Sequence, residues 1–520
     1  MKKHPNQLFS TFILVLFLLA ACSPSSKTAS SALPRSIPEA EGVSSEGILD
    51  FLDAAAKSNN ELHSFIFIRH GKVIAEGWWK PYQNNLKHTL YSTSKSFTST
   101  AIGFAVSEQL LTVNDQVISF FPDDLPDSIS SNLANLKIKH LLSMSAGQDP
   151  EPTFNTVRSD SNWVKSFLAT PIVHEPGTVF LYNSLASYML SAIVQKVSGQ
   201  TVKDYLTPRL FEPLAIEGYD WEIDPQGINT GGWGLRLKTE DMAKFGQLLL
   251  QKGKWNEQQI IPAAWVDEAT TAKIDQNPNA TPEERVNNSW LQGYGYQFWR
   301  CQHNAFRADG AYGQYIIVMP DQDAVVAIQA ETADMQDEIN LVWDYLLPAI
   351  KEGQLPIDTE SNKRLKKQLA ELALPIAAKQ LNSQLVDQLN TNTFKLASNQ
   401  MKWKSISFQF NGEQCALTFA TSQTEYPISF NTGKWAFGET SMLGPNLLLG
   451  ALDHHKGLLP EKIAASFSCI DENTIEFVLR YIETPHTEKI RCTLHENELD
   501  VQVEFSQAPG SIAPFKGIKQ

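Results

Sequence analysis

The stretch Tyr91-Ser92-Thr93-Ser94-Lys95-Ser96-Phe97, followed by apolar residues up to Val106, predicts the first turns of a helix. Residues three apart share one face of a helix, so the Lys95 amine would lie one turn from the Ser92 hydroxyl. A serine needs such a base to act as a nucleophile, and the free N–H groups at a helix start stabilise an anion that forms there. The same residues are also typical of an ordinary surface helix with a serine cap, so the prediction depends on partners elsewhere in the chain.

The sequence on either side of this stretch predicts one antiparallel sheet assembled from both ends of a domain. The patterns occur in this order: a helix at 44–57, a hairpin of 63–69 and 72–79, helices at 138–142, 185–197 and 239–250, strands at 294–300, 315–319 and 324–330, and a helix at 339–350. We therefore expect a mixed α/β (α+β) domain over residues 37–352, with a helical insertion in its middle. The Ser92 helix would leave the sheet at the border of the two halves, where clefts commonly form.

Three further motifs follow Ser92-x-x-Lys95 along the chain. They are Pro176-Gly-x-x-Phe180-x-Tyr182-Asn-Ser184, the run Gly232-Trp-Gly-Leu-Arg-Leu-Lys-Thr-Glu-Asp-Met-Ala243, and Asp309-Gly-Ala-Tyr-Gly-Gln314. In this order the four motifs resemble the serine hydrolases of the β-lactamase and D-alanyl-D-alanine peptidase superfamily, and most closely its class C-like esterases and nylon-oligomer hydrolases. The resemblance implies a β-lactamase/transpeptidase-like fold, with helices flanking the antiparallel sheet.

The resemblance also implies a role for individual residues. Ser92 would be the acylated nucleophile, Lys95 its base and Tyr182 a second proton carrier, while the backbone N–H groups of Ser92 and Ala311 would form the oxyanion hole. Substrate contacts are implied for Ser184, Asp309, Gly310 and Gln314. A lysine in a dry cleft loses affinity for its proton, and we expect a tyrosine that faces an ammonium group to lose its own proton more readily. Without the other motifs, Tyr182-Asn-Ser would indicate only a helix cap. Gly310 and Gly313 would likewise indicate only a turn at a strand edge.

Two departures from the superfamily bear on the substrate. Ser184 stands where an asparagine is often found, and Ala308 stands where a lysine or histidine often grips a substrate carboxylate. Loss of that cation favours a small-molecule or peptide-like ester or amide without a carboxylate. Arg307 could supply the cation from one position earlier, which would restore β-lactamase or D-Ala-D-Ala peptidase activity. A catalytically silent binding protein on the same fold is the remaining alternative.

The C-terminal part of the chain has a different pattern. Residues 353–390 are charged and have helical spacing, which predicts a helical linker. In residues 391–520 apolar and polar residues alternate, for example at 406–410, 475–481, 490–494 and 499–505, so we expect an all-β domain. It loosely resembles lipocalin-like barrels. Such a domain could hold a ligand in its mouth, or could serve as a lid or docking module.

The N-terminal residues predict an address in the bacterial cell envelope. Residues 1–21 have the layout of a signal peptide and are followed directly by Cys22, and the run Leu19-Ala-Ala-Cys22 resembles the lipobox of bacterial lipoproteins. The resemblance implies lipid attachment at Cys22, with residues 22–36 as a flexible tether, and Ser23 resembles the sorting pattern for the outer membrane, facing the periplasm. The alternative is a plain signal peptide with an incidental Cys22.

Composition excludes several other classes of protein. The formal net charge of −14 argues against nucleic acid as a partner. Cysteine and histidine spacings match no metal site, so we expect no metal ion, and nothing in the sequence implies a cofactor. We expect His140 to cap a helix or lie in the core, and His454-His455 to have no third ligand. Buried free thiols are favoured over disulfides for four cysteines, Cys301, Cys415, Cys469 and Cys492.

Overall fold

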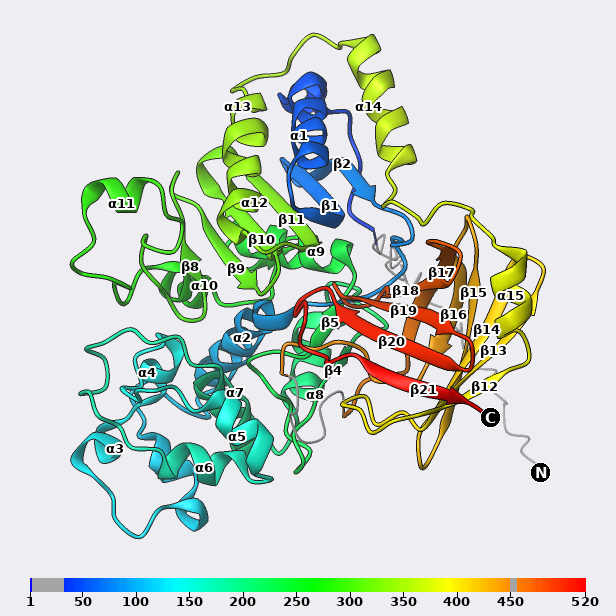
Figure 1. The fold of residues 1–520 in the computed structure, drawn as a ribbon. Helices are drawn as coiled ribbons and strands as arrows, with labels where there is room; N and C mark the ends of the chain where they lie inside the picture. Colours follow the sequence, from blue (N-terminus) through cyan, green and yellow to red (C-terminus); the bar gives the residue numbers. More distant parts are fainter. Residues whose placement is uncertain (2–31, 449–455) are drawn as a thin grey trace. The chain divides into compact units, whose positions relative to one another are not determined.

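The computed structural model describes Met1 and residues 32–448 and 456–520. The chain divides into Met1–Ser31 and Ala32–Gln520, and all described residues other than Met1 belong to the second unit (Figure 1). The predicted lipidation site Cys22 lies outside the described residues, as do His454 and His455. No helix among the described residues is long and apolar enough to cross a bilayer.

A six-stranded antiparallel sheet joins the two ends of the N-terminal domain, as the sequence predicted. The hairpin of β1 (Glu61–Arg69) and β2 (Lys72–Trp78) pairs through β1 with β11 (Ala324–Glu331). The strand order is β2-β1-β11-β10-β9-β8, and the other strands are β8 (Trp299–Arg300), β9 (Phe306–Gly310) and β10 (Gln314–Met319). Pairing between segments about 260 residues apart places everything between them in an insertion.

Helices cover both faces of this sheet, which explains why β1 is buried along nearly its whole length. On one face Phe65 and Phe67 share a core with α1 (Ser45–Lys57), α12 (Met335–Leu341) and α13 (Leu347–Ala349). On the other face Ile66 and Ile68 share a core with α9 (Thr239–Leu250) and α2 (Ser94–Ser107). Ser44 caps α1 by accepting a hydrogen bond from the Gly47 N–H. Helix α2 is therefore a central, buried helix and not a surface one.

The structure corrects the sequence prediction at the far edge of the sheet. The strand expected at 294–300 is reduced to β8, because residues 294–298 form bends and isolated bridges. Strand β9, which was not predicted, replaces it beside β10. Its Arg307 and Asp309 are buried ionic residues, so this short strand lacks the alternation that identifies a half-exposed strand.

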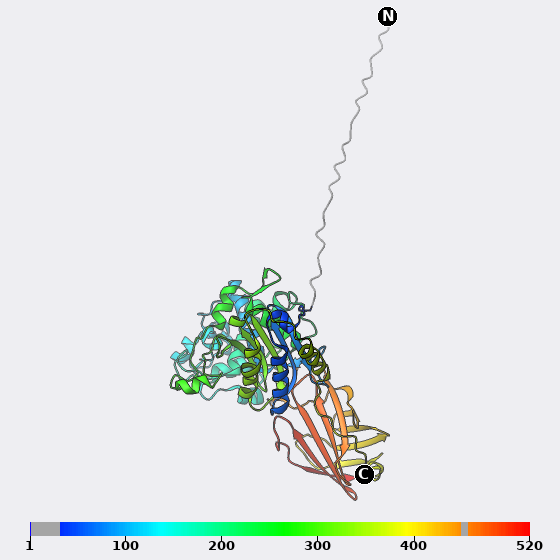
Figure 2. The same cartoon turned by 90° about the horizontal axis from the view of Figure 1, so that it is seen from above.

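The C-terminal domain is a closed β-barrel that follows a linker with two helices, α14 (Thr359–Glu371) and α15 (Ser383–Leu389) (Figures 1 and 2). Its strands are β12 (Thr393–Leu396), β13 (Ser405–Asn411), β14 (Gln414–Ala420), β15 (Glu425–Asn431), β16 (Ala436–Thr440), β17 (Glu461–Cys469), β18 (Thr474–Tyr481), β19 (Thr487–His495), β20 (Glu498–Phe505) and β21 (Phe515–Lys519). In the described part of this domain, nine strands form a ring that closes where Asn431 pairs with Ser466, and β16 adds to β17.

Apolar side chains occupy the barrel interior. Phe477 is fully buried, and its ring centroid lies 6.1 Å from that of Phe408, 5.0 Å from Phe430 and 5.8 Å from Phe467. These rings belong to one buried core cluster of the barrel. The four cysteines named above are buried and unpaired, as predicted.

Candidate active site

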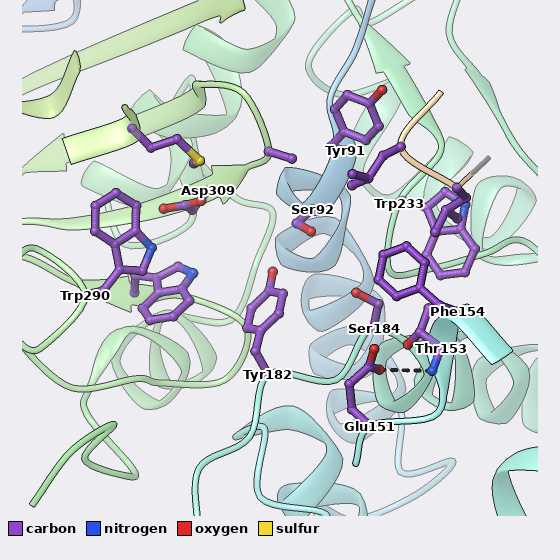
Figure 3. Close-up of a pocket in the computed structure, with 15 residues that line it drawn as sticks. Tyr91, Ser92, Glu151, Thr153, Phe154, Tyr182, Ser184, Trp233, Trp290 and Asp309 are labelled. Atoms are coloured by element: carbon purple, nitrogen blue, oxygen red, sulfur yellow. Dashed lines mark hydrogen bonds between the residues drawn. The ribbon is translucent and has the colours of Figure 1, made fainter. Parts of the chain in front are cut away.

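Ser92 lies in the single turn of 3-10 helix, Tyr91–Thr93, that leads directly into α2. The Lys95 Nζ donates hydrogen bonds to Ser92 Oγ (2.9 Å), Ser184 Oγ (3.0 Å) and the Gly232 carbonyl (2.7 Å). Three of the four sequence motifs therefore meet at one amine. Figure 3 shows Ser92, Ser184 and Tyr182 facing one another across the pocket.

Burial changes the acid–base character of Lys95. The side chain is almost fully buried, and the loss of solvation lowers the pKa of its ammonium group to about 7. The nearby carboxyls of Glu151 and Asp309 act in the opposite direction but do not cancel this effect. A large fraction of Lys95 is consequently neutral near pH 7 and can accept a proton from Ser92. The lowered proton affinity agrees with the sequence prediction.

Tyr182 behaves differently from the sequence prediction. Its pKa is raised, because burial outweighs the hydrogen bond with Ser92 that would favour the phenolate. The Lys95 Nζ lies over the face of the Tyr182 ring, 4.8 Å from its centroid. The expectation that Tyr182 loses its proton readily is therefore wrong. A phenol that keeps its proton is suited to donate one.

The turn between β9 and β10 brings the Ala311 backbone to the same pocket as Ser92. Gly310 allows this close approach, because a Cβ at that position would lie 2.2 Å from the Leu90 carbonyl oxygen. Tyr312 and Gly313 both have left-handed backbones, with φ of 64° and 88°. Ser92 and Ala311 thus line one pocket, and the oxyanion hole formed by their N–H groups stays a prediction.

Gln314 lies behind this turn and not in the pocket. It is fully buried, and its side-chain amide donates to the carbonyls of Ala311 (3.3 Å) and Ala330 (2.6 Å). Gly310 does not line the pocket either. The predicted substrate contacts of these two residues are therefore replaced by a supporting role for the turn, whereas Ser184 and Asp309 do line the pocket.

Asn183, next to Tyr182, has a structural role. It caps α7 (Ser184–Ser198) by accepting a hydrogen bond from the Ala186 N–H, and it donates to Gln148 Oε1 at 2.8 Å. Of these two neighbouring residues, Ser184 is therefore the one whose side chain contacts Lys95. His140 also acts as a cap, because its Nδ1 accepts from the Lys137 N–H, in line with the sequence prediction.

The pocket over Ser92 has a volume of about 410 Å³. Aromatic and aliphatic side chains form most of its walls: Phe154, Trp233, Trp290, Trp299, Met335, Leu447 and Leu448. Its charged lining groups, among the described residues, are the carboxyls of Glu151 and Asp309. Sequence reasoning did not identify Glu151 or the aromatic wall, because these residues, apart from Trp233, lie outside the four motifs.

Arg307 does not supply a cation to this pocket. Its guanidinium group is fully buried, where it donates to Asp309 Oδ2 (2.8 Å) and to the Ser289 carbonyl (3.0 Å) and lies over the Trp290 ring. Its charge is thus matched by Asp309 beneath the pocket wall. Within the described part of the chain, no group of three or more His, Cys, Asp or Glu residues could hold a metal ion.

Comparison with known proteins bears on the family and the fold of this chain. The sequence model of the family described as beta-lactamase matches residues 63–346. The 6-aminohexanoate-dimer hydrolase of Paenarthrobacter ureafaciens is 22% identical over 51% of this chain and 71% of its own length. The beta-lactamase of Escherichia coli K12 is 22% identical over 35% of this chain, which spans only 52% of that relative. A solved structure from Bacillus anthracis, named as a candidate 6-aminohexanoate-dimer hydrolase, has a TM-score of 0.50 at 19% identity and covers 64% of this chain and 88% of its own.

Proposed function

Because the chain belongs to the beta-lactamase family, we propose that it is a serine hydrolase that cleaves an uncharged ester or amide through an acyl-enzyme on Ser92. The observation that carries this proposal is the contact between Lys95 Nζ and Ser92 Oγ at 2.9 Å, made by a buried lysine with a pKa of about 7. A serine paired with a neutral amine at the floor of a pocket is an activated nucleophile.

Acylation would begin with neutral Lys95. Its lone pair accepts the Ser92 proton as Oγ attacks the substrate carbonyl, and the negative charge develops on the carbonyl oxygen. The N–H groups of Ser92 and Ala311 receive this oxyanion. Transition-state charge is stabilised by these donors because they are already oriented before the reaction begins.

Collapse of the tetrahedral intermediate needs a proton on the leaving group. Tyr182 keeps its proton, since burial raises its pKa, and its hydroxyl lies beside Ser92. Tyr182 would give this proton to the departing alkoxide or amine. The protonated Lys95, which holds the proton taken from Ser92, would then return one to the Tyr182 phenolate, so that both groups regain their starting states. Water then attacks the acyl-enzyme by the reverse sequence of proton transfers.

The charge of the pocket supports a substrate without a carboxylate. Apart from Lys95, which contacts Ser92 from below, the described residues around the pocket offer two carboxyls and no cation. A substrate carboxylate would lose its hydration without gaining a charged partner. A β-lactamase or D-Ala-D-Ala peptidase role is therefore less well supported than an esterase or amidase role.

Labelling with a fluorophosphonate tests this proposal against the catalytically silent alternative. Wild-type protein should take up one label, and Ser92→Ala should take up none. Ser107→Ala is a matched control on the same helix, because the Ser107 hydroxyl bonds only locally, to the Phe104 carbonyl, and it should label like wild type. Absence of label on folded wild-type protein, together with no turnover of nitrophenyl esters, would show that the fold carries a binding function instead.

We also propose, from the sequence alone, that Cys22 is lipidated and anchors the protein in the cell envelope. Cys22→Ser should then abolish incorporation of a fatty-acid analogue and release the protein from the membrane fraction. A wild-type protein that is found free in the periplasm, with another mature N-terminus, would contradict this proposal.

A further inference from the structure

Two residues with strained backbones flank the proposed oxyanion hole. Tyr91 immediately precedes Ser92 and has a φ of 46°, and Tyr312 immediately follows Ala311 and has a φ of 64°. Residues other than glycine adopt this left-handed conformation at a cost, so the surrounding structure must hold them there. The positions of the Ser92 and Ala311 N–H groups depend directly on these two tyrosines.

One side chain of the barrel contacts both tyrosines. His486 Nε2 is hydrogen-bonded to the Tyr91 hydroxyl, and the ring of His486 meets that of Tyr312 edge-on, with centroids 5.0 Å apart. The rings of Tyr91 and Tyr312 also contact each other, at 5.6 Å. Figure 3 shows the Tyr91 hydroxyl directed away from Ser92, so Tyr91 is held from outside the site and is not itself a proton carrier.

The hydrogen bonds of His486 define its orientation. Its Nδ1 lies 2.7 Å from Glu331 Oε1, which also accepts from the Ser506 hydroxyl. Because a carboxylate only accepts, Nδ1 carries the proton toward Glu331, and Nε2 accepts from the Tyr91 hydroxyl. Glu331 ends strand β11 of the catalytic sheet. The hydrogen bonds therefore link Tyr91 to His486 and His486 to Glu331. The first and last of these residues belong to the catalytic domain, and His486 belongs to the barrel.

The loop that carries His486 is itself held in place. Thr89 N–H donates to the Glu483 carbonyl (2.8 Å), and the Tyr82 hydroxyl donates to the Thr484 carbonyl (3.1 Å). Within the loop, the His486 N–H donates to the Thr484 hydroxyl (3.1 Å), and His486 is fully buried. The His486 ring consequently has a defined position against the two tyrosines.

We propose that His486 is a positioning residue of the active site: through Tyr91 and Tyr312 the barrel sets the placement of the two N–H groups that receive the oxyanion. This inference rests on the proposed function for its kinetic consequence. Loss of one oxyanion donor lowers kcat by about 100- to 1000-fold, and a small misplacement of reacting groups costs up to about 100-fold. We therefore expect His486→Ala to lower kcat for a nitrophenyl ester by about 10- to 100-fold, with KM changed by less than about threefold.

Three further variants distinguish a positioning role of His486 from a general loss of contact between the barrel and the catalytic domain. Tyr91→Phe removes the hydroxyl and should share the kcat defect. His486→Gln keeps a polar group near the Nε2 position and should recover part of the rate. Tyr82→Phe removes one hydrogen bond to the same loop, but the Thr89 bond to the loop and the Glu331 bond to the His486 ring remain. It should therefore leave kcat close to wild type while shifting the thermal midpoint as much as His486→Gln does.

Hydrogen exchange of the full chain provides a readout that does not depend on activity. In His486→Ala, peptides that cover 90–95 and 310–314 should exchange faster than in wild type, whereas Tyr82→Phe should not change them. Unchanged exchange in both peptides, or a kcat for His486→Ala equal to that of Tyr82→Phe, would overturn the inference. If wild type neither labels nor turns over an ester, the proposed function fails, and the exchange data alone then decide whether His486 orders the two segments.

Discussion

The pocket beside Ser92 and the interior of the barrel are both lined by aromatic rings, but they use them differently. In the barrel, rings such as Phe408, Phe430 and Phe477 pack against one another within one apolar core. In the pocket, Trp299 stacks on Tyr182, and the rings enclose a buried lysine with a lowered pKa. The same residue types stabilise a fold in one region and perturb the chemistry of a polar group in the other.

The largest expected effect comes from substitutions that remove proton transfer in the pocket and leave the fold intact. Lys95→Ala and Tyr182→Phe should each lower kcat by about 1000- to 10,000-fold, because both groups move protons in the same steps, and the double variant should be little worse than either single one. Steady-state kinetics with an alkyl ester or a linear amide measures this, because these leaving groups need a proton in order to depart. Thermal midpoints should stay within about 5 °C of wild type. Strictly additive losses in kcat would instead indicate two independent roles.

The converse change should affect stability and spare activity. Phe477→Ala removes a ring from the centre of the barrel and should lower the free energy of unfolding by about 3–5 kcal/mol. Denaturant unfolding measures this, with Phe437→Ala as the control, because Phe437 is 58% exposed and should cost under about 0.5 kcal/mol. Below the melting transition, kcat of Phe477→Ala should remain within about threefold of wild type. A kcat loss comparable to that of Lys95→Ala would erase the distinction between the two regions.

A negative charge on the substrate should have a smaller effect on kcat/KM than the loss of Lys95 or Tyr182 has on kcat. This effect depends on the pocket alone. Without a cationic anchor, a cephalosporin forgoes a charge-assisted hydrogen bond, so its kcat/KM should fall below that of a short-chain nitrophenyl ester by at least about 10- to 100-fold. Arg307→Ala tests the remaining route to an anchor. Since Arg307 is buried against Asp309, this variant should be less stable without a selective loss of cephalosporin turnover. Efficient cephalosporin hydrolysis that collapses in Arg307→Ala would show that the guanidinium does bind the carboxylate.

The sequence predicted the features that depend on local pattern. The β1–β2 hairpin and the caps at Ser44 and His140 follow from periodicity and short motifs, and Ser92 and Lys95 meet because residues three apart share one helical face. Strand β9 was missed because buried Arg307 and Asp309 neutralise each other inside it. Such compensation is invisible until both partners are placed in space.

Long-range pairing explains what sequence reasoning could not identify. Tyr91 and His486 are 395 positions apart, and neither lies in a motif that indicates the other. The proton affinity of Tyr182 was predicted in the wrong direction, because burial of the phenol raises its pKa, and the extent of that burial cannot be seen in the sequence. Residue identity gives the chemistry available at a site, whereas burial and orientation determine which group holds the proton.

The smallest expected effect concerns the pH dependence that burial gives to Lys95. Only the neutral amine accepts the Ser92 proton, and the pKa of this group is lowered to about 7. The rate constant kcat/KM should therefore fall about tenfold per pH unit below 7 and level off above it. Because burial raises the pKa of Tyr182, loss of its proton should not limit activity at moderately alkaline pH.

Glu151→Gln sharpens this pH prediction, because the Glu151 carboxylate raises the pKa of Lys95 through its charge. Removing that charge makes the ammonium form of Lys95 less stable. The acidic limb of the pH profile of kcat/KM should therefore move to lower pH, by about half a unit. Glutamine retains the oxygen that accepts from the Thr153 N–H, which leaves the loop intact. The matched control is Asp149→Asn, an exposed acid of the same loop, whose profile should coincide with wild type. A limb that moves to higher pH in Glu151→Gln, or stays in place, would show that another group than Lys95 controls the rate.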